Sequence, residues 1–164
     1  MLEPADLLGV ARTLASGATP SDAAHRRAIS TAYYALFHAA LRTAAERFIG
    51  RDEGETAAYA LLYRGFAHGR MRDVCVAIEK PHLAPRYAKL LRRPRVSQEM
   101  RTFASAFVDL QQRRHTADYD PQAELGRADA ADACDSAELA MTALARAGDG
   151  EIADIFALLL VDPR

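Results

Sequence analysis

The 164-residue sequence lacks several features that mark common classes of protein. It contains no tryptophan, and its two cysteines, Cys75 and Cys134, are far apart, with no CxxC or Cys/His ligand spacing. This arrangement favours buried, reduced thiols in a reducing compartment. Neither an H-E-x-x-H pattern nor a glycine-rich phosphate loop is present, so we expect no bound metal and no cofactor.

Long apolar runs are also missing. The longest run, Ile152 to Val161, contains Asp154 and is too short to span a bilayer. No basic and then apolar leader opens the sequence. We therefore expect a cytoplasmic protein with no membrane partner.

The sequence has little net charge, but the charge that it has is unevenly distributed. The formal net charge is −1, which gives no global indication of a nucleic-acid partner. Residues 64–95 contain nine basic and two acidic residues, whereas residues 118–164 contain three basic and eleven acidic ones. Two interpretations stay open: the arginine-rich segment 86–95 contacts RNA phosphates, or the two segments lie close together and neutralise each other.

Helical periodicity dominates what is present. Apolar residues recur at steps of three or four through most of the chain, and no window alternates with the period of two that marks a strand. The pattern predicts an all-α fold, an antiparallel bundle of four to five main helices in one domain spanning residues 1–164. The helical segments are expected at residues 4–16, 23–49, 56–64, 71–80, 97–114, 121–147 and 151–161. Residues 81–96 contain three prolines and are expected to form an irregular connection with at most one turn of helix.

The helix expected over residues 23–49 has two distinct faces. Its apolar face has Leu36 near the middle, and a second face carries a stripe with Tyr34, His38 and Arg42. Such a stripe is too polar for a core and too aromatic for an ordinary solvated surface. It predicts either polar contacts inside a helix interface or the rim of an anion site, and it favours pairing of two chains. Three further histidines, His25, His68 and His82, are predicted to be structural or exposed.

A second concentration of polar side chains lies at residues 113–121. Asp120 followed by Pro121 is typical of a helix start, so we expect a tight corner between two helices here. Arg114 and Asp118 are spaced for an ordinary ion pair across one helical turn, or for a phosphate-binding arginine that an aspartate orients. Tyr119 is either a packed tyrosine or a proton donor. In the helix that is expected to follow, Leu139 is predicted to face inward.

Two stretches of the chain together resemble a known family. Arg27-Ala28-Ile29-Ser30-Thr31-Ala32-Tyr33-Tyr34-Ala35-Leu36-Phe37-His38-Ala39-Ala40 resembles the first long helix of HEPN domains (higher eukaryotes and prokaryotes nucleotide-binding). Leu110-Gln111-Gln112-Arg113-Arg114-His115-Thr116-Ala117-Asp118-Tyr119-Asp120 resembles the Arg-x-x-Ala-Asp-Tyr signature of an uncharacterised HEPN subgroup. The resemblance covers nearly the whole chain. It implies a helical bundle of four to five helices and a two-fold homodimer.

The resemblance also implies a site. In HEPN ribonucleases the active motif is an arginine followed by a polar residue, with four to six residues between the arginine and a histidine. Arg114 matches the arginine and His115 the polar position, but Tyr119 stands where the histidine is expected. A histidine titrates near neutrality, whereas the reference pKa of tyrosine, about 10, makes it a poor base at pH 7. Phosphate binding is therefore implied more directly than catalysis.

Three hypotheses follow. The first is a nucleotide- or RNA-binding protein that works with a nucleotidyltransferase partner, as in a toxin–antitoxin pair. Its binding residues would be Arg113, Arg114, Asp118, Arg27, Tyr34 and His38. The second is a divergent, metal-independent ribonuclease toxin that uses Arg114, His115 and Tyr119. The third is a non-catalytic interaction bundle in which these polar groups are inert.

Overall fold

The computed structural model describes residues 2–17 and 21–160, and within these residues the regular structure is entirely helical. The described helices are α1 (Pro4–Ser16), α2 (Asp22–Phe48), the short 3-10 helix η1 (Arg51–Glu53), α3 (Ala57–Gly65), α4 (His68–Ile78), α5 (Pro85–Leu91), α6 (Gln98–Tyr119), α7 (Arg127–Arg146) and α8 (Asp149–Leu160). The predicted all-α class is confirmed. The described part of the chain holds eight α-helices, more than the four to five main helices expected, because several short helices accompany the long ones.

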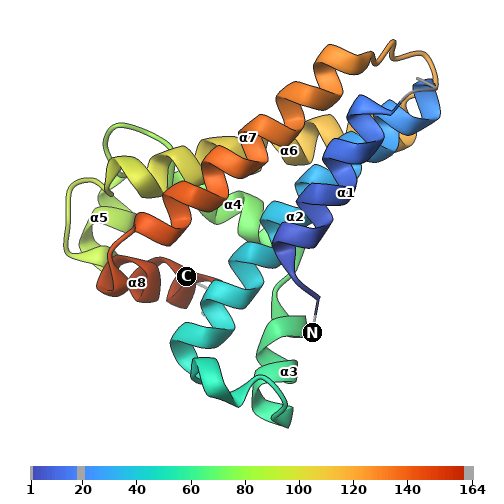
Figure 1. The fold of residues 1–164 in the computed structure, drawn as a ribbon. Coiled ribbons are helices and arrows are strands. Elements are labelled where there is room, and N and C mark those ends of the chain that lie inside the picture. The colour runs from blue at the N-terminus through green and yellow to red at the C-terminus, as the bar shows by residue number, and fades with distance from the viewer. Residues whose placement is uncertain (1, 18–20, 161–164) are drawn as a thin grey trace.

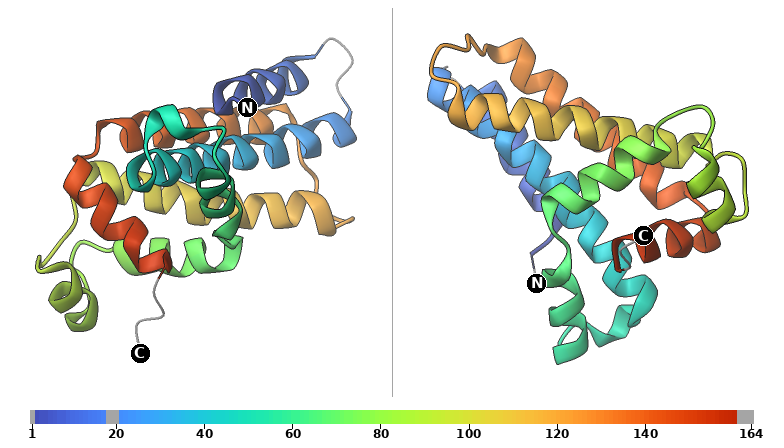
Figure 2. Two further views of the ribbon diagram at one scale, coloured as in Figure 1. Left: turned by 90° about the horizontal axis from the view of Figure 1, so that it is seen from below. Right: turned by 180° about the vertical axis from the view of Figure 1, so that it is seen from behind.

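The body of the molecule consists of α1, α2, α6 and α7, with α2 in contact with the other three (Figure 1). Arg26 near the start of α2 bonds the carbonyl of Ala117 near the end of α6, so these two helices run antiparallel. His25 is hydrogen-bonded to the carbonyl of Leu125 just before α7, so α2 and α7 run in the same direction. Two further views show α3 projecting from this body and α8 lying across one end of it (Figure 2).

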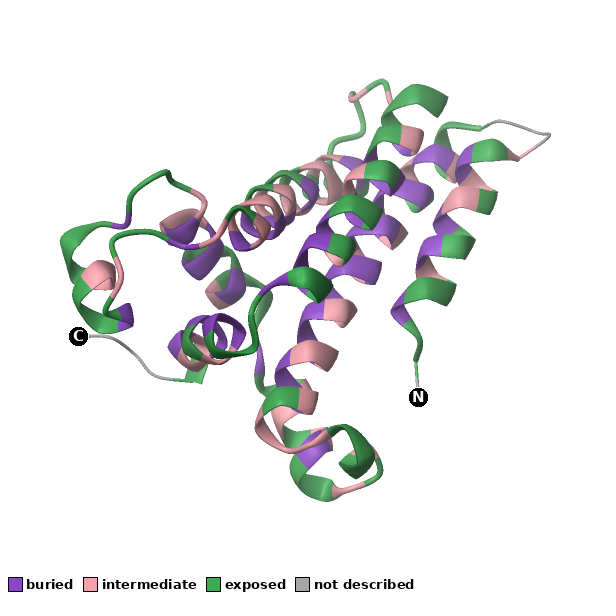
Figure 3. Ribbon diagram, turned by 60° about the vertical axis from the view of Figure 1, so that its left-hand side comes forward, coloured by how far each residue is buried: buried purple, intermediate pink, exposed green. Residues whose placement is uncertain are grey.

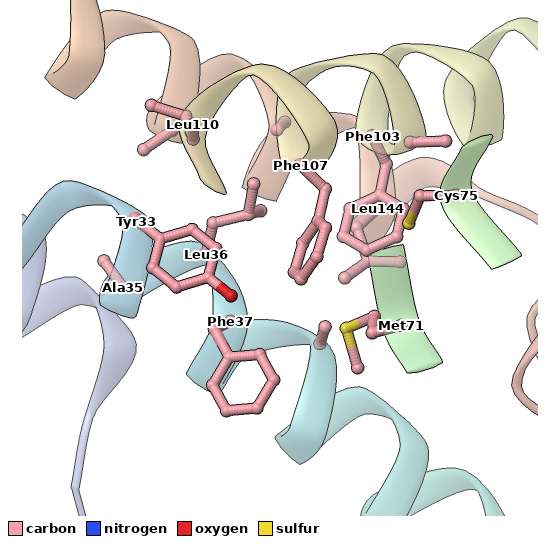
Figure 4. Close-up of a cluster of buried hydrophobic side chains, with 14 of the residues drawn as sticks. Tyr33, Ala35, Leu36, Phe37, Met71, Cys75, Phe103, Phe107, Leu110 and Leu144 are labelled. Carbon is pink, nitrogen blue, oxygen red and sulfur yellow. The ribbon is translucent and has the colours of Figure 1, made fainter. Parts of the chain in front are cut away.

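Helix α2 is central because its apolar positions repeat around most of its circumference. The Ser21 side chain accepts a hydrogen bond from the Ala24 amide and so caps its first turn. Leu36 is fully buried, with Tyr33 and Phe37 beside it and Phe107 of α6 opposite (Figure 4). The predicted inward face of this helix is thus confirmed, and colouring by burial shows the same continuous buried stripe (Figure 3).

The α4 helix closes the core on the other side of α6. Its Met71 and Cys75 are buried near Phe103 (Figure 4). Both cysteines are free and buried, as predicted, and burial raises the pKa of the Cys75 thiol, which keeps it protonated. No helix among the described residues has the combined length and apolarity needed to cross a membrane.

The prediction of a tight corner between two helices at residues 113–121 is wrong. Helix α6 continues to Tyr119, so the polar residues lie on its last two turns rather than at a junction. Asp120 ends α6 and accepts a hydrogen bond from the Gln122 amide in a turn, while Pro121 lies in the loop before α7. Helix α7 begins only at Arg127, after Gly126, because the Asp129 carboxylate accepts the Gly126 amide and caps the helix there.

Two smaller predictions also need correction. Residues 85–91 form α5, because Pro85 suits the first position of a helix and does not interrupt it. Leu139 is 62% exposed, since α7 turns a row of alanines toward α1, α2 and α6 and points this leucine away. The buried residues of α7 are Ala130, Ala133, Cys134, Ala137, Ala140, Ala143 and Leu144.

The uneven charge distribution is partly neutralised within the chain. Arg93 pairs with Glu151 at 3.1 Å and with Asp154 at 2.5 Å, which joins the basic segment to α8. Glu151 is 9% exposed and also accepts the Ser97 amide, so this contact fixes the start of α6. The other basic residues of the arginine-rich segment 86–95, which are Arg86, Lys89, Arg92 and Arg95, are exposed.

Candidate functional site

Arg114 is the centre of the polar cluster that α2 and α6 form together. Its Nη2 donates a hydrogen bond of 3.0 Å to the Tyr34 hydroxyl, and its Nε lies 2.8 Å from Oδ2 of Asp118. The Nε–H is not aligned with that oxygen, so the second contact is an ion pair rather than a hydrogen bond. The guanidinium carbon lies 5.6 Å from the ring centroids of both Tyr34 and Tyr119. Three side chains therefore restrict where this cation can lie.

Asp118 is held from two sides. Its Oδ1 accepts a hydrogen bond of 2.5 Å from the Ser30 hydroxyl, while Oδ2 faces Arg114. Ser30 is fully buried and comes from α2, so the carboxylate is fixed to the neighbouring helix as well as to its own. The Arg114 and Asp118 side chains stay 24% and 22% exposed, which leaves the guanidinium reachable from solvent. Among the described residues, no hydrogen bond uses the remaining nitrogen of Arg114, Nη1.

Arg26 holds the end of α6 that carries this cluster. It donates hydrogen bonds to the backbone carbonyls of Ala117, Asp120 and Ala123, and it pairs with Asp22 at 2.5 Å. The carbonyls at a helix C-terminus carry a partial negative charge that repels anions. The Arg26 cation offsets that charge, so an anion near Arg114 meets less repulsion from the end of the helix.

The two other candidates on α6 lie at its outer side. His115 and Tyr119 are one turn apart, with ring centroids 5.0 Å apart and planes at 52°. His115 is exposed and Tyr119 is 63% exposed, so Tyr119 is not the packed tyrosine that one interpretation of the sequence expected. Together with Arg114, the two rings form a cationic and aromatic edge that faces solvent.

A histidine from α4 joins the cluster. His68 shares a 2.7 Å hydrogen bond with the Tyr33 hydroxyl, and its ring stacks on Phe37 with centroids 3.8 Å apart. The ring edge also meets Tyr34 at a centroid distance of 6.0 Å, one contact away from Arg114. Burial of one ring face lowers the pKa of His68 below its usual value, and the positive charge of Arg114 lowers it further.

The rest of the predicted stripe on α2 does not reach this cluster. His38 shares a 2.7 Å hydrogen bond with the Tyr63 hydroxyl of α3, and the two line a cavity of about 240 Å³. Arg42 pairs with Glu3 and Glu46. Burial lowers the pKa of His38. These contacts fit the interpretation in which the stripe is satisfied inside the chain.

The predicted binding residues Arg27 and Arg113 lie in different surroundings: among the described residues, Arg27 is unpaired on α2, and Arg113 is ion-paired on α6. Arg27 is exposed and lies on the same face of α2 as Ser30 and Tyr34, since the three are spaced at i, i+3 and i+7. Its side chain makes no hydrogen bond or ion pair with any described residue, so it adds a free positive charge to that face. Arg113 instead pairs with Asp109 at 2.7 Å and lies beside Gln112 and Thr116 on the side toward α7.

The cluster thus brings together Arg114, Asp118, Tyr34 and Tyr119, with His115 beside Tyr119. Sequence reasoning missed Arg26, Ser30 and His68. The helical spacing of Arg27, Ser30 and Tyr34 was a usable signal for Ser30, whereas Arg26 and His68 reach the cluster through contacts between distant parts of the chain. Within the described residues, no group of three His, Cys, Asp or Glu side chains is placed to hold a metal ion.

Comparisons of the chain with protein-family models, with curated proteins and with solved structures gave no match. Functional interpretation therefore depends on the chemistry of the cluster. A fixed arginine that remains open to solvent can bind a phosphate, exposed aromatic rings can stack on a base, and a neutral imidazole can exchange a proton.

Proposed function

We propose that this chain is a HEPN-like protein that binds RNA or a nucleotide through its phosphate, with Arg114 as the main ligand. The observation that carries the proposal is the placement of Arg114 between Tyr34, Tyr119 and Asp118, with its side chain 24% exposed. A guanidinium already fixed in orientation loses little freedom on binding, and it matches phosphate oxygens in a bidentate way.

The charges around Arg114 support an anionic ligand. Asp118 contacts Arg114 at Nε only, and its other oxygen accepts the Ser30 hydroxyl, so the outer nitrogens of the guanidinium are not covered by this carboxylate. Arg27 adds an unpaired positive charge on the same face of α2. Arg26 offsets the negative end of α6. A phosphate at this edge would thus meet the Nη1 of Arg114 and the cation of Arg27, which are both uncommitted among the described residues.

The test compares Arg114→Gln with Arg12→Gln. Arg12 pairs with Asp135 and Glu138 between α1 and α7, so its removal changes net charge and breaks ion pairs without touching the cluster. We expect Arg114→Gln to weaken binding of a labelled single-stranded RNA in fluorescence anisotropy by about tenfold, as loss of a charge-assisted contact does, and Arg12→Gln to change it little. If both variants bind the RNA as tightly as the wild type does, Arg114 does not bind its phosphate.

Thermal melts of the same variants separate binding from folding. Asp118 keeps its hydrogen bond to Ser30 when Arg114 is removed, so we expect only a small loss of stability. If Arg114→Gln instead unfolds the chain at the assay temperature, Arg114 is a structural anchor. The third hypothesis, an inert interaction bundle, would then be favoured.

The partners that we propose come from the HEPN resemblance. They are a second copy of the chain and a nucleotidyltransferase, as in a toxin–antitoxin pair. Co-expression with a nucleotidyltransferase encoded next to this chain tests the second partner. Co-purification at a fixed ratio is the expected result, and separate elution of the two proteins would reject it.

A second candidate function is metal-independent cleavage of RNA, and His68 favours it. Tyr119 stands where the ribonuclease motif has histidine, but His68 brings an imidazole with a lowered pKa next to Tyr34 and so close to Arg114. Its Nδ1 is engaged by Tyr33, and no described residue hydrogen-bonds Nε2. In the tautomer in which Nδ1–H donates to the Tyr33 oxygen, Nε2 carries the lone pair and can accept the proton of a ribose 2′-hydroxyl as that oxygen attacks the adjacent phosphate held by Arg114.

Cleavage of this kind is measured with RNA in the presence of a chelator. The products are a 2′,3′-cyclic phosphate and a free 5′-hydroxyl, because the leaving 5′-oxygen takes up a proton. We expect His68→Gln to abolish such cleavage while leaving RNA binding intact. RNA that stays whole with the wild-type protein would leave binding as the sole function proposed for this site.

A further inference from the structure

Tyr119 is unusual among the aromatic residues of this chain. All of the phenylalanine and tyrosine side chains lie within the described residues, and Tyr119 is the one among them that is exposed, at 63%. It is the last residue of α6, so no further helical turn covers it. Because the ring is exposed to water, it adds little to the stability of the fold through burial. Its neighbours therefore indicate which ligand it can bind.

The ring is nevertheless held in place. His115, one turn earlier, supports it at a centroid distance of 5.0 Å, and the Arg114 guanidinium carbon lies 5.6 Å from its centroid. Arg26 fixes the backbone of the same helix end through the Ala117 and Asp120 carbonyls. Tyr119 is therefore supported by its own helix, while most of its surface stays open to solvent.

We infer that Tyr119, supported by His115, is a stacking platform for an unpaired nucleic-acid base whose phosphate lies on Arg114. This inference rests on the proposed phosphate site and specifies its ligand as single-stranded. A flat, fixed ring next to a cation is the combination that binds single strands, because each base offers a π-face and each nucleotide a phosphate. In a duplex those base faces are stacked on one another and cannot reach Tyr119.

The low net charge of the chain agrees with this assignment. A protein of net charge −1 has little long-range attraction for a polyanion, so non-specific binding to duplex backbone is weak. Stacking does not depend on net charge. Contact with one base therefore supplies a larger share of the affinity here than it does in a strongly basic protein.

The experiment measures anisotropy of a labelled ten-nucleotide RNA, alone and annealed to its complement, with Tyr119→Ala, Tyr119→Phe and a control, Leu139→Ala. Leu139 on α7 is 62% exposed, nearly the same as Tyr119, but lies outside the cluster. We expect Tyr119→Ala to weaken single-strand binding by about tenfold, which is typical of losing one base–aromatic stack. Tyr119→Phe, which keeps the ring, and the Leu139→Ala control should bind as the wild type does.

The duplex should bind more weakly than the single strand and should not respond to Tyr119→Ala. A DNA strand of the same sequence shows whether Tyr119 contacts the base or the ribose. If the ring stacks on a base, Tyr119→Ala should weaken binding of DNA as much as binding of RNA. A loss of affinity for RNA alone would indicate a contact with the ribose. Wild-type affinity of Tyr119→Ala, with Arg114→Gln still impaired, would overturn the platform and leave the phosphate site standing. A shift of oligomeric state in Tyr119→Ala without any change in RNA affinity would assign the ring to a contact between two copies, and would also overturn it.

Discussion

Arg114 and Arg113 are neighbours in the sequence, yet their surroundings differ completely. Arg113 pairs with Asp109 along one edge of α6, whereas Arg114 is turned toward α2 and meets the Tyr34 hydroxyl. Successive helical residues are separated by about 100° around the axis, because an α-helix has 3.6 residues per turn. Only one of the two can therefore face the α2–α6 interface, and that one holds the candidate anion site.

Two histidines whose rings are partly buried, His38 and His68, are expected to make stability depend on pH. Burial lowers the pKa of both His38 and His68 in the folded chain below the usual 6.5. The unfolded chain then binds protons more readily, so stability is full above about pH 6.5 and falls as the pH drops through that value toward the lowered folded pKa. Urea melts at pH 5, 6, 7 and 8 should show this loss on the acid side.

The matched variant for this prediction is the double substitution His38→Gln and His68→Gln. Removing both imidazoles should flatten the pH dependence between pH 5 and 7. Wild-type stability that is constant or higher at pH 5 would show that these two groups are not desolvated in solution.

At the residue scale, the sequence allowed part of the site to be predicted. The Arg114–Asp118 pair follows from a spacing of four on one helix. The Tyr34 contact spans 80 positions and could be expected only from the family resemblance. His68 is exposed, which agrees with its prediction as structural or exposed, but nothing local in the sequence shows that α4 starts against Tyr33 and Phe37.

At the scale of elements, α2 and α7 bury their faces differently. Leu36 of α2 is fully buried, whereas Leu139 of α7 is 62% exposed. We expect Leu36→Ala to lower the free energy of unfolding by about 2–5 kcal/mol, because it leaves a cavity in the core. Leu139→Ala, the same chemical change at the surface, should stay within about 0.5 kcal/mol of wild type.

Urea denaturation of the two leucine variants in parallel measures both effects. A small effect of Leu36→Ala, below about 0.5 kcal/mol, would mean that the inward face of α2 is misassigned. A large effect of Leu139→Ala would mean instead that another chain covers α7.

The end of α6 depends on one side chain from another element. Arg26 of α2 donates to three carbonyls at and after the last turn of α6, at Ala117, Asp120 and Ala123. We expect Arg26→Gln to cost about 1–3 kcal/mol, the usual range for hydrogen bonds to a charged group. Because Asp118 and Tyr119 lie in that last turn, RNA binding should weaken as well.

Amide hydrogen exchange gives the local measurement for Arg26→Gln. Faster exchange should be confined to the last turn of α6, with the start of the helix protected as in wild type. A control, Arg47→Gln, changes an exposed residue in the last turn of α2 and should change neither exchange in α6 nor RNA affinity. Uniformly faster exchange along α6 would show that Arg26 supports the whole fold rather than this helix end.

The boundaries of the elements were less predictable than their class. Helical periodicity gave the correct type for every long helix, because burial of one face repeats every three to four residues. The junction between α6 and α7 was misplaced, since Asp120-Pro121 has the local chemistry of a helix start. The long-range contacts of Arg26 and the cap at Gly126 determine where these helices end and begin.

At the scale of the whole molecule, we expect a dimer. The HEPN resemblance implies a two-fold pair, although the polar stripe that favoured it is largely satisfied within the chain through Tyr63, Glu3 and Glu46. Light scattering at tens of micromolar should give about twice the chain mass of 17.9 kDa. A mass of one chain would contradict the dimer that the resemblance implies, and it would leave the proposed phosphate site unaffected.

The central claim is that Arg114 binds a phosphate, and the salt dependence of RNA affinity tests it most directly. Each phosphate contact to a single strand contributes about 0.7 to the slope of log affinity against log salt, because binding releases condensed counterions. We expect the magnitude of the slope for Arg114→Gln to be smaller than that for wild type by about 0.7, and that for Arg12→Gln to be unchanged. Identical slopes for wild type and Arg114→Gln would contradict the claim, whatever the two absolute affinities are.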